Sequence, residues 1–274
     1  MSMMRLSLCI ILALFSSHSL AESSSKNNRG LSIGAGPSLV RFDSNLKITN
    51  KSSGSHLYID TEGTLGLPKQ DSAPLIFGSY RFANRHGIAA SYFDIRRENI
   101  LLDQELDLGD YTAYGDIRLQ DTSDFYSLNY SYSLFEDERS FVLASFGIFG
   151  LDLGLGLEAT GGIIDGDTVI NQQSLNTNIS VFAPLPLIGL DFWYAYTPKW
   201  GVGTKVSFIS GSYNDLSATL LDTVVRARYT FSKHFDVLMG IKYFNAEVEV
   251  NNNRYLNELS YGLDGFFFGL NYRL

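Results

Sequence analysis

Three histidines and the carboxylates near them are the residues that could support catalysis in this sequence. His56 lies close to Asp60 and Glu62, and a histidine paired with a carboxylate is a common general base. His86 and His234 stand at short turns between apolar segments, where a turn or interface role is the simpler interpretation. No serine is paired with a histidine at a spacing that indicates nucleophilic catalysis. We therefore expect a protein that is not an enzyme, with a lipid- or peptide-hydrolysing enzyme as the alternative.

An acidic stretch, 98–124, is the second place where side chains could do chemistry. Carboxylate oxygens bind hard cations such as Ca²⁺, but this spacing matches no EF-hand loop, and Asp165-Gly166-Asp167 is only a fragment of one. We expect a solvated acidic loop, no metal site and no cofactor. The carboxylates of this stretch are Glu98, Asp103, Glu105, Asp107, Asp110, Asp116, Asp121 and Asp124.

The overall composition limits the classes of partner. The chain has 274 residues with 29 acidic and 21 basic side chains, a formal net charge of -8. This balance argues against nucleic acid, whose binding requires clustered Lys and Arg. Charged residues make up 18% of the chain, below the roughly 25% of soluble domains. The 19 Phe, 16 Tyr and 25 Gly indicate a fold with many strands.

The first 21 residues have the three parts of a secretory signal. Arg5 supplies the positive region, Leu6–Phe15 the apolar region, and Ala21 ends a small-residue cleavage site. The apolar run is too short for a membrane-spanning helix, which needs about 20 residues. We predict cleavage after Ala21, giving a signal peptide 1–21 and one domain 22–274. The mature chain then lacks Cys9 and has 29 acidic against 20 basic residues, a net charge of -9.

Alternation of apolar and polar residues with period two fills the rest of the chain. In Phe125–Leu134, for example, the even positions carry Tyr or Leu and most odd positions carry Ser or Asn. Such alternation is typical of a strand with one apolar and one polar face. We count ten segments of this kind, approximately 31–42, 73–84, 86–98, 117–133, 140–159, 176–196, 200–213, 216–232, 236–250 and 256–274.

The connections between these segments alternate between short turns and longer polar stretches. Short turns fall near 84, 137, 198 and 233, with the longer stretches between them. This is the pattern of a bacterial outer-membrane barrel whose short turns face the periplasm. We predict an all-β fold, a transmembrane antiparallel up-and-down β-barrel of about 10 strands, with 8 or 12 as alternatives.

Two stretches depart from the simple pattern. Within 140–159 the apolar residues change phase, which predicts a β-bulge near Ile148–Gly150 that would restore one apolar face. The polar stretch 43–72 has room for a further hairpin through His56–Asp60 or for a short helix around Thr61–Leu67.

Aromatic residues gather beside the predicted short turns. Rings that recur at one end of successive hairpins indicate a belt at a membrane–water interface, because an amphipathic ring is stable there. A soluble sandwich has no reason to collect rings at one rim. The predicted belt consists of Tyr80, Phe82, Tyr132, Phe141, Tyr194, Tyr196, Trp200, Tyr229, Phe231 and Phe235.

The carboxyl terminus carries a specific local pattern. Phe266, Phe268, Leu270, Tyr272 and Leu274 occupy every second position up to the last residue. This resembles the carboxy-terminal pattern of outer-membrane proteins that the barrel-assembly machinery reads, although the last residue of that pattern is usually Phe. The resemblance implies that this machinery is a partner during biogenesis.

Several longer stretches resemble an uncharacterised group of proteobacterial outer-membrane β-barrel proteins. The resemblance covers most of the chain after residue 21 and implies a location but no established activity. It is carried by IDTEGTLGLP at Ile59–Pro68, YRFANRHGIAASYFDIRRE at Tyr80–Glu98, APLPLIGLDFWYAYTPKW at Ala183–Trp200 and the Asp264–Leu274 end.

Charged residues are expected in the lumen once the apolar faces meet lipid. Both signs occur, which favours a narrow, salt-bridged lumen in a non-enzymatic envelope or surface protein; a small-solute, porin-like channel is the alternative. Arg226 and Arg228 against Asp222 and Asp236 are the first pairs that we would test. Expected partners are outer-membrane lipid and lipopolysaccharide, the latter through cations at the acidic loops. The predicted lumen residues are Arg81, Asp191, Lys205, Asp222, Arg226, Arg228, Asp236 and Lys242.

Overall fold

The computed structural model describes residues 30–82, 84–107, 111–159, 162–165, 168–171, 175–213 and 215–274. The predicted signal segment, Met1–Ala21, lies outside them, as does its cleavage site. The regular elements of the described residues are all β-strands. No helix in this part of the chain is long and apolar enough to cross a membrane.

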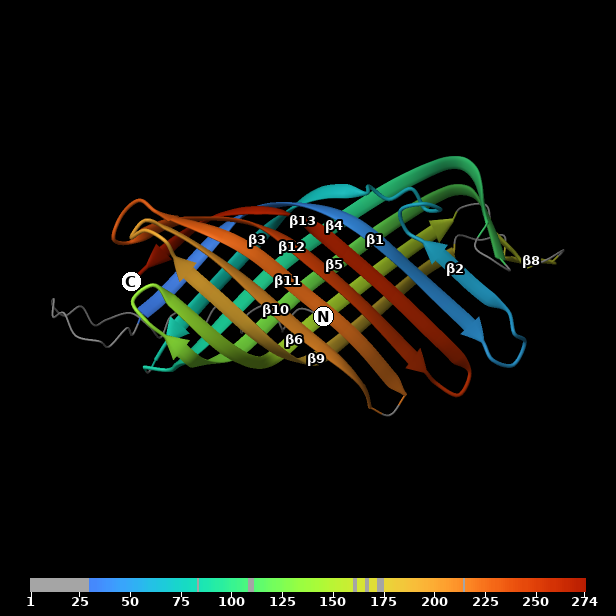
Figure 1. The fold of residues 1–274 in the computed structure, drawn as a ribbon. Coiled ribbons are helices and arrows are strands. Elements are labelled where there is room, and N and C mark those ends of the chain that lie inside the picture. Colours follow the sequence, from blue (N-terminus) through green and yellow to red (C-terminus); the bar gives the residue numbers. More distant parts are fainter. Residues whose placement is uncertain are drawn as a thin grey trace, which may run out of the picture.

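Ten of the thirteen described strands form one closed antiparallel ring (Figure 1). Each pairs with its neighbours in chain order, and the first pairs with the last, so the predicted up-and-down barrel of ten strands is confirmed. The ring consists of β1 (Gly30–Asn50), β3 (Gln70–Arg81), β4 (His86–Asp107), β5 (Tyr111–Glu136), β6 (Ser140–Ala159), β9 (Leu175–Ala195), β10 (Trp200–Tyr213), β11 (Leu216–Thr230), β12 (Phe235–Asn251) and β13 (Tyr255–Arg273).

The turns that join β3 to β4, β5 to β6, β9 to β10 and β11 to β12 all lie at one end of the barrel, here called the short-turn end. Three of them begin with a polar side chain that accepts backbone hydrogen bonds: the Asp137 carboxylate accepts from Arg139 N at 2.8 Å, Thr197 Oγ1 from Trp200 N at 2.9 Å and Ser232 Oγ from Phe235 N at 3.0 Å. Such side chains favour a turn over a continued strand. The backbone N–H groups of Arg139 and Ser140 also hold the pKa of Asp137 below its ordinary value. The opposite end is called the long-loop end.

Stretch 43–72 forms the predicted extra hairpin. β1 continues to Asn50, and β2 (His56–Asp60) pairs back onto it from Asn45↔Asp60 to Thr49↔His56. The alternative of a helix around Thr61–Leu67 is wrong, because this segment folds as successive turns. The Asp60 carboxylate accepts from Gly63 N at 2.6 Å, a local bond that competes with helix formation.

The acidic stretch 98–124 is not a loop. β4 runs to Asp107 and β5 starts at Tyr111, with a register shift between Leu101 and Gln104. The expectation of a solvated acidic loop is therefore wrong, because a long antiparallel ladder continues through it and sends alternate carboxylates to opposite faces. Two further strands, β7 (Gly162–Asp165) and β8 (Thr168–Asn171), extend this side of the barrel.

The bulge predicted near Ile148–Gly150 is absent. β6 pairs without a shift through Ile148↔Leu128, Phe149↔Ser127 and Gly150↔Tyr126 on one side, and equally without a shift against β9. The register shift between β5 and β6 lies instead in β5, between Ser133 and Phe135. Phe149 consequently points into the barrel and is buried, because the interior at this level is apolar.

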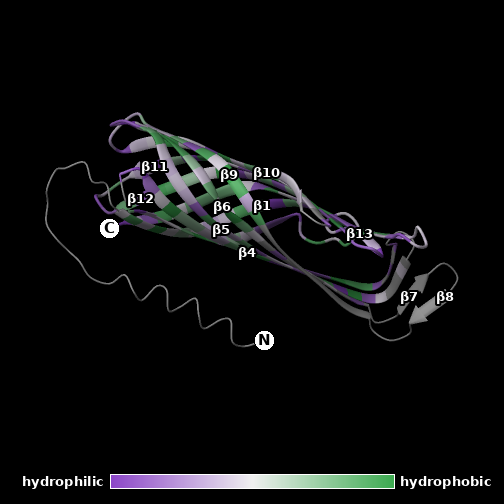
Figure 2. Cartoon of the chain, turned by 90° about the horizontal axis from the view of Figure 1, so that it is seen from below, coloured by the Kyte–Doolittle hydropathy of each residue, from purple (hydrophilic) through white to green (hydrophobic). Residues whose placement is uncertain are grey.

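The two faces of the ring differ in the way that the alternation predicts. Figure 2 shows hydrophobic and hydrophilic positions interspersed along the strands of the ring. The outer face exposes a continuous set of large apolar side chains. Among them are Ile33, Leu39, Ile76, Ile88, Leu128, Phe146, Ile148, Ile188, Leu190, Phe208, Val225, Ile241, Phe266 and Phe268.

Candidate functional site: the barrel interior

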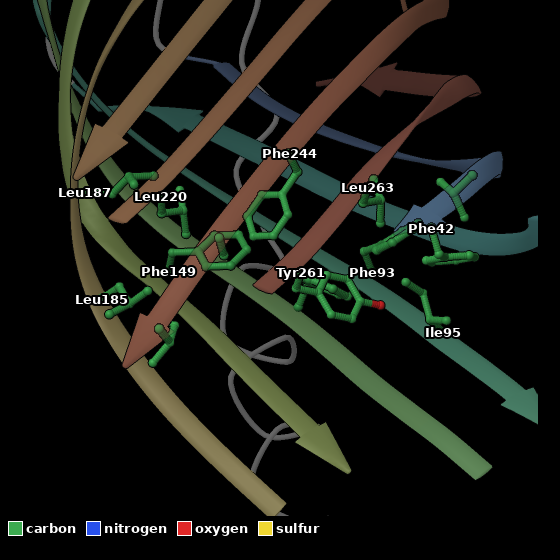
Figure 3. Close-up of a cluster of buried hydrophobic side chains, with 14 of the residues drawn as sticks. Phe42, Phe93, Ile95, Phe149, Leu185, Leu187, Leu220, Phe244, Tyr261 and Leu263 are labelled. Carbon is green, nitrogen blue, oxygen red and sulfur yellow. The ribbon is translucent and has the colours of Figure 1, made fainter. Parts of the chain in front are cut away.

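An apolar layer fills the middle of the barrel. Phe125 is its centre, with ring centroids 5.6 Å from those of Phe93, Phe244 and Tyr261. Phe149 stacks on Phe244 at 5.2 Å, and Figure 3 shows these two rings meeting from different strands. The layer also contains Val40, Phe42, Ala73, Ile95, Leu185, Leu187, Ala218, Leu220, Ala246, Val248 and Leu263.

A buried ion cluster lies on the long-loop side of this layer. The side chain of Arg97, on β4, is fully buried and pairs with both Glu62 and Asp121. Its Nε donates to Asp121 Oδ2 at 2.8 Å, and its guanidinium stands over the Phe42 ring, 4.1 Å from the centroid. Charge-assisted bonds of this kind hold three distant chain segments together.

Glu62 attaches the turn segment 61–68 to the barrel. Its carboxylate accepts from the Ser44 backbone N and Oγ, both at 2.7 Å, as well as from Arg97. Burial alone raises the pKa of the Glu62 carboxyl, but the hydrogen bonds from Arg97 and Ser44 outweigh it and hold that pKa below its ordinary value. Leu65 and Leu67 of the same segment are buried, so the segment closes the interior.

The lumen toward the short-turn end is polar, and all eight predicted lumen residues belong to strands lining it on the inner face. Arg226 Nη2 pairs with Asp191 at 2.7 Å, and Lys242 pairs with Asp222. The predicted pairing of Arg226 and Arg228 with Asp222 and Asp236 is therefore wrong, because these two carboxylates pair with other cations. The remaining members are Arg81, Lys205, Arg228 and Asp236.

Two of these members have well-defined partners near the short turns. Asp236 is fully buried; it accepts from Thr230 Oγ1 at 2.6 Å and lies 2.9 Å from Arg273 Nε. Arg81 donates to Glu136 Oε1 at 2.8 Å and to a turn carbonyl. Both contacts connect a strand end with a neighbouring strand or turn, so they stabilise the short-turn end of the ring.

The predicted aromatic belt lies on the outer face with one exception. Trp200 and Tyr229 meet from neighbouring strands with centroids 4.7 Å apart, and Phe231 stacks on Phe235 at 5.8 Å. Phe141 is the exception: its ring stacks on Trp193 inside the barrel, because the odd-numbered positions of β6 face inward. The outward members are Tyr80, Phe82, Tyr132, Tyr194, Tyr196, Trp200, Tyr229, Phe231 and Phe235.

The carboxy-terminal set also lies on the outer face. Its side chains are exposed on β13 and just beyond it, next to the start of β1, where Leu274 N donates to Leu31 O at 2.9 Å. The last strand therefore both closes the ring and presents apolar side chains at alternate positions on the outer face. The set is Phe266, Phe268, Leu270, Tyr272 and Leu274.

The two carboxylates proposed as partners of the candidate catalytic histidine are engaged by other groups. His56 lies on β2, while Asp60 accepts from turn N–H groups and Glu62 from Arg97 and Ser44. Among the described residues, no group of three or more His, Cys, Asp or Glu side chains could hold a metal ion.

Sequence reasoning missed the ion cluster of Arg97, Glu62 and Asp121. Arg97 and Asp121 were each visible as charged residues at odd positions of alternating segments, which was the only available signal. Their meeting with Glu62 depends on how segment 61–68 folds back, and no local pattern encodes that.

Comparisons with known proteins bear on the architecture alone. No family model and no curated protein matches the sequence, so the resemblance to the outer-membrane barrel group stays a prediction. Solved structures similar to it include Ail of Yersinia pestis (10% identity, TM-score 0.30, 90% of this chain and 99% of that one) and OprG of Pseudomonas aeruginosa (12%, 0.30, 90% and 97%). The Ralstonia pickettii toluene transporter TbuX is another (9%, 0.37, 90% and 89%). At such identities and TM-scores, no function is transferred from them to this chain.

Proposed function

We propose that this chain is an integral bacterial outer-membrane β-barrel with a closed lumen, acting as a non-enzymatic envelope protein. The observation that carries the proposal is the combination of a lipid-like outer face with an interior filled across its middle. An exterior of exposed Leu, Ile, Val and Phe is stable in hydrocarbon and unfavourable in water.

The apolar outer face ends sharply on the side of the long-loop end. On β13 the outward apolar positions run through Phe266–Leu274 and give way to Asp264, which pairs with Arg41 at 3.0 Å on the neighbouring strand. On the other side of the ring, the paired residues Asp94 and Asp124 mark the same change. An apolar band of this length fits the about 9–11 residues with which a tilted strand crosses a bilayer.

The orientation follows from the ends of the barrel. The aromatic rings beside the short turns fit one membrane–water interface, and short turns face the periplasm in bacterial barrels. The acidic long-loop end then faces outward, where cation bridging to lipopolysaccharide is our proposed contact. The exposed apolar side chains at alternate positions of β13 support the proposal that the barrel-assembly machinery recognises this strand during insertion.

The closed lumen is supported by two successive barriers. The phenylalanine layer spans the interior, and the Arg97 cluster with segment 61–68 covers it on the long-loop side. Ten strands enclose little more than the side-chain-filled interior of eight, whereas open channels have about 16–18. The rival function, a small-solute channel, requires a water path through both barriers.

Planar-bilayer recording tests the closed lumen. We expect refolded protein to insert without stepwise conductance, because desolvating an ion at the phenylalanine layer is costly. An open porin reconstituted in the same bilayers is the positive control, and heat-modifiable migration of the recovered protein verifies that it was folded. Discrete conductance steps from the wild-type protein would establish the channel instead.

A further inference from the structure

A cavity of about 500 Å³ occupies the barrel between the phenylalanine layer and the short-turn end. Its lining begins at Phe93 and Phe244 of the layer and extends to Gly30, Arg81 and Arg85 beside the short turns. A solute would therefore reach it from the short-turn end. Cavities of about 300–1,000 Å³ are the usual size of small-molecule sites.

The two walls of this cavity differ in chemistry. The wall formed by β3, β4 and β5 combines small or neutral polar side chains, such as Ser91, Ser127 and Asn129, with Phe77 and the phenylalanine layer. Arg81 and Arg85 are charged residues beside the short turns, and the facing wall, formed by β9 to β12, carries the other charged residues of the lining. Its charged residues are Asp191, Lys205, Asp222, Arg226, Arg228 and Lys242.

Cations outnumber carboxylates on the charged wall by four to two. Asp191 is taken by Arg226 and Asp222 by Lys242, in the ion pairs described above. Lys205 and Arg228 remain, and no carboxylate of the described residues lies within ion-pairing distance of either. The Arg228 guanidinium instead stands over the Trp193 ring, 4.5 Å from its centroid.

This surplus is local, because the whole chain carries a net charge of -8. Lys205 and Arg228 are both partly buried, so they have lost part of their hydration. The carboxylates that attract them, Asp191 and Asp222 for Lys205 and Asp236 for Arg228, act from beyond ion-pairing distance and are paired with other cations. An anion in the cavity would supply the missing charge and accept their hydrogen bonds. The site is therefore electrostatically prepared for an anion.

Aromatic rings make up much of the remaining lining. Phe77, Phe141, Trp193 and Phe267 all contribute to the cavity, which ends at the phenylalanine layer. These rings offer apolar contact to a hydrocarbon or aromatic body, and inorganic phosphate or sulfate would leave that contact unused. The lining thus favours an anion with an apolar part.

We propose that this cavity binds a small organic anion. The carboxylate of the anion lies at Lys205 and its apolar body against the aromatic rings, while Arg228 lies near the mouth of the cavity. The site gives the closed barrel a ligand that enters from the short-turn side. Only the side of entry, the periplasm, rests on the proposed membrane orientation; the binding itself does not.

Fluorine NMR of folded, detergent-solubilised protein tests this proposal. The probe is 4-fluorophenylacetate, and its neutral amide, 4-fluorophenylacetamide, reports binding without charge. We expect saturable binding of the acid and at least tenfold weaker binding of the amide, because a charge-assisted hydrogen bond contributes about 1.5–3 kcal/mol. Inorganic phosphate should compete weakly.

The matched variants each remove one cation. Lys205→Met should weaken binding of the acid at least tenfold, and Lys205→Arg should retain most of it. Lys47→Met is the control, because Lys47 lies toward the long-loop end and pairs with Glu258 at 2.9 Å. Its affinity should equal that of the wild type.

Three results would overturn the proposal: no saturable binding of the acid, equal binding of acid and amide, or unchanged affinity in Lys205→Met. If Lys205→Met does not fold, Arg228→Gln provides the same comparison at the mouth, with at least a threefold loss expected and an unchanged affinity counting against the site. Conductance through the barrel would contradict the closed lumen, but the binding measurements would still show whether the anion binds. The two proposals can therefore fail separately.

Discussion

At the scale of single residues, Arg97 and Glu62 show what a buried charge does in this barrel. Each is nearly inaccessible to water, so the pair is stable only because every charged oxygen has a donor close by. Ser44 supplies two of those donors from β1, and Asp121 accepts hydrogen bonds from the guanidinium of Arg97. One turn segment is thereby attached to three strands.

Glu62 makes part of the stability dependent on pH. Its pKa is lowered in the folded state, so its contribution is fully present above the ordinary pKa of a glutamate, about 4.3, and is lost as the pH falls through the lower folded value. At pH 7 we expect Glu62→Gln to lower the free energy of unfolding by about 1.5–3 kcal/mol. The difference from wild type should shrink below about pH 4.

Urea unfolding in detergent at pH 7 and pH 3.5 measures this difference. Glu258→Gln is the matched control, because Glu258 is exposed beside Lys47 and such pairs contribute about 0–1 kcal/mol. A gap between wild type and Glu62→Gln that stays constant with pH would contradict the assigned role of Glu62.

At the scale of elements, β6 decides how the interior is filled. Its neighbours Ile148 and Phe149 face opposite sides of the ring, one exposed outward and one buried in the phenylalanine layer. A bulge would have turned the second half of the strand toward the outside. The unbroken ladder instead directs Phe149 inward.

Alanine at these two positions should have unequal effects. Phe149→Ala leaves a cavity inside the layer and should lower the free energy of unfolding by about 3–5 kcal/mol. Ile148→Ala should cost clearly less, because lipid or detergent chains fill the space on the outer face. Equilibrium unfolding of both variants in the same lipid gives the comparison, and equal losses would indicate that β6 is bulged after all.

At the scale of the whole molecule, closure is the main source of cohesion. Pairing of β1 with β13 runs from Ser32↔Arg273 to Asn50↔Tyr255, so these two strands leave no free edge in the ring. A closed ladder satisfies backbone hydrogen bonds where no water is present. Such a ring resists detergents that unfold ordinary sheets.

Heat-modifiable migration in detergent gels tests this closure. Unheated protein should run as a compact band and boiled protein as a slower, unfolded one, because heating breaks the ladder. A single band that is independent of heating, together with a monomer soluble without detergent, would exclude the membrane barrel.

Most of the barrel could be predicted from local sequence because strand formation and turn formation are local. Period-two alternation predicted strands that begin at His86, Ser140 and Trp200, and β4, β6 and β10 begin at these residues. Polar residues such as Asp137 and Thr197 marked the short turns through hydrogen bonds that span only a few residues. The number of strands and their up-and-down order followed from these signals.

The sequence by itself thus determined the strands, their order and which end carries the short turns. Only the tertiary structure decided that Phe141 and Phe149 face inward, that Arg226 pairs with Asp191, and that Glu62 meets Arg97. Alternation assigns residues to two faces, but an apolar residue fits either lipid or a packed interior. Which side chains meet across the lumen depends on the stagger of ten strands around the ring, and that is fixed only when the ring closes.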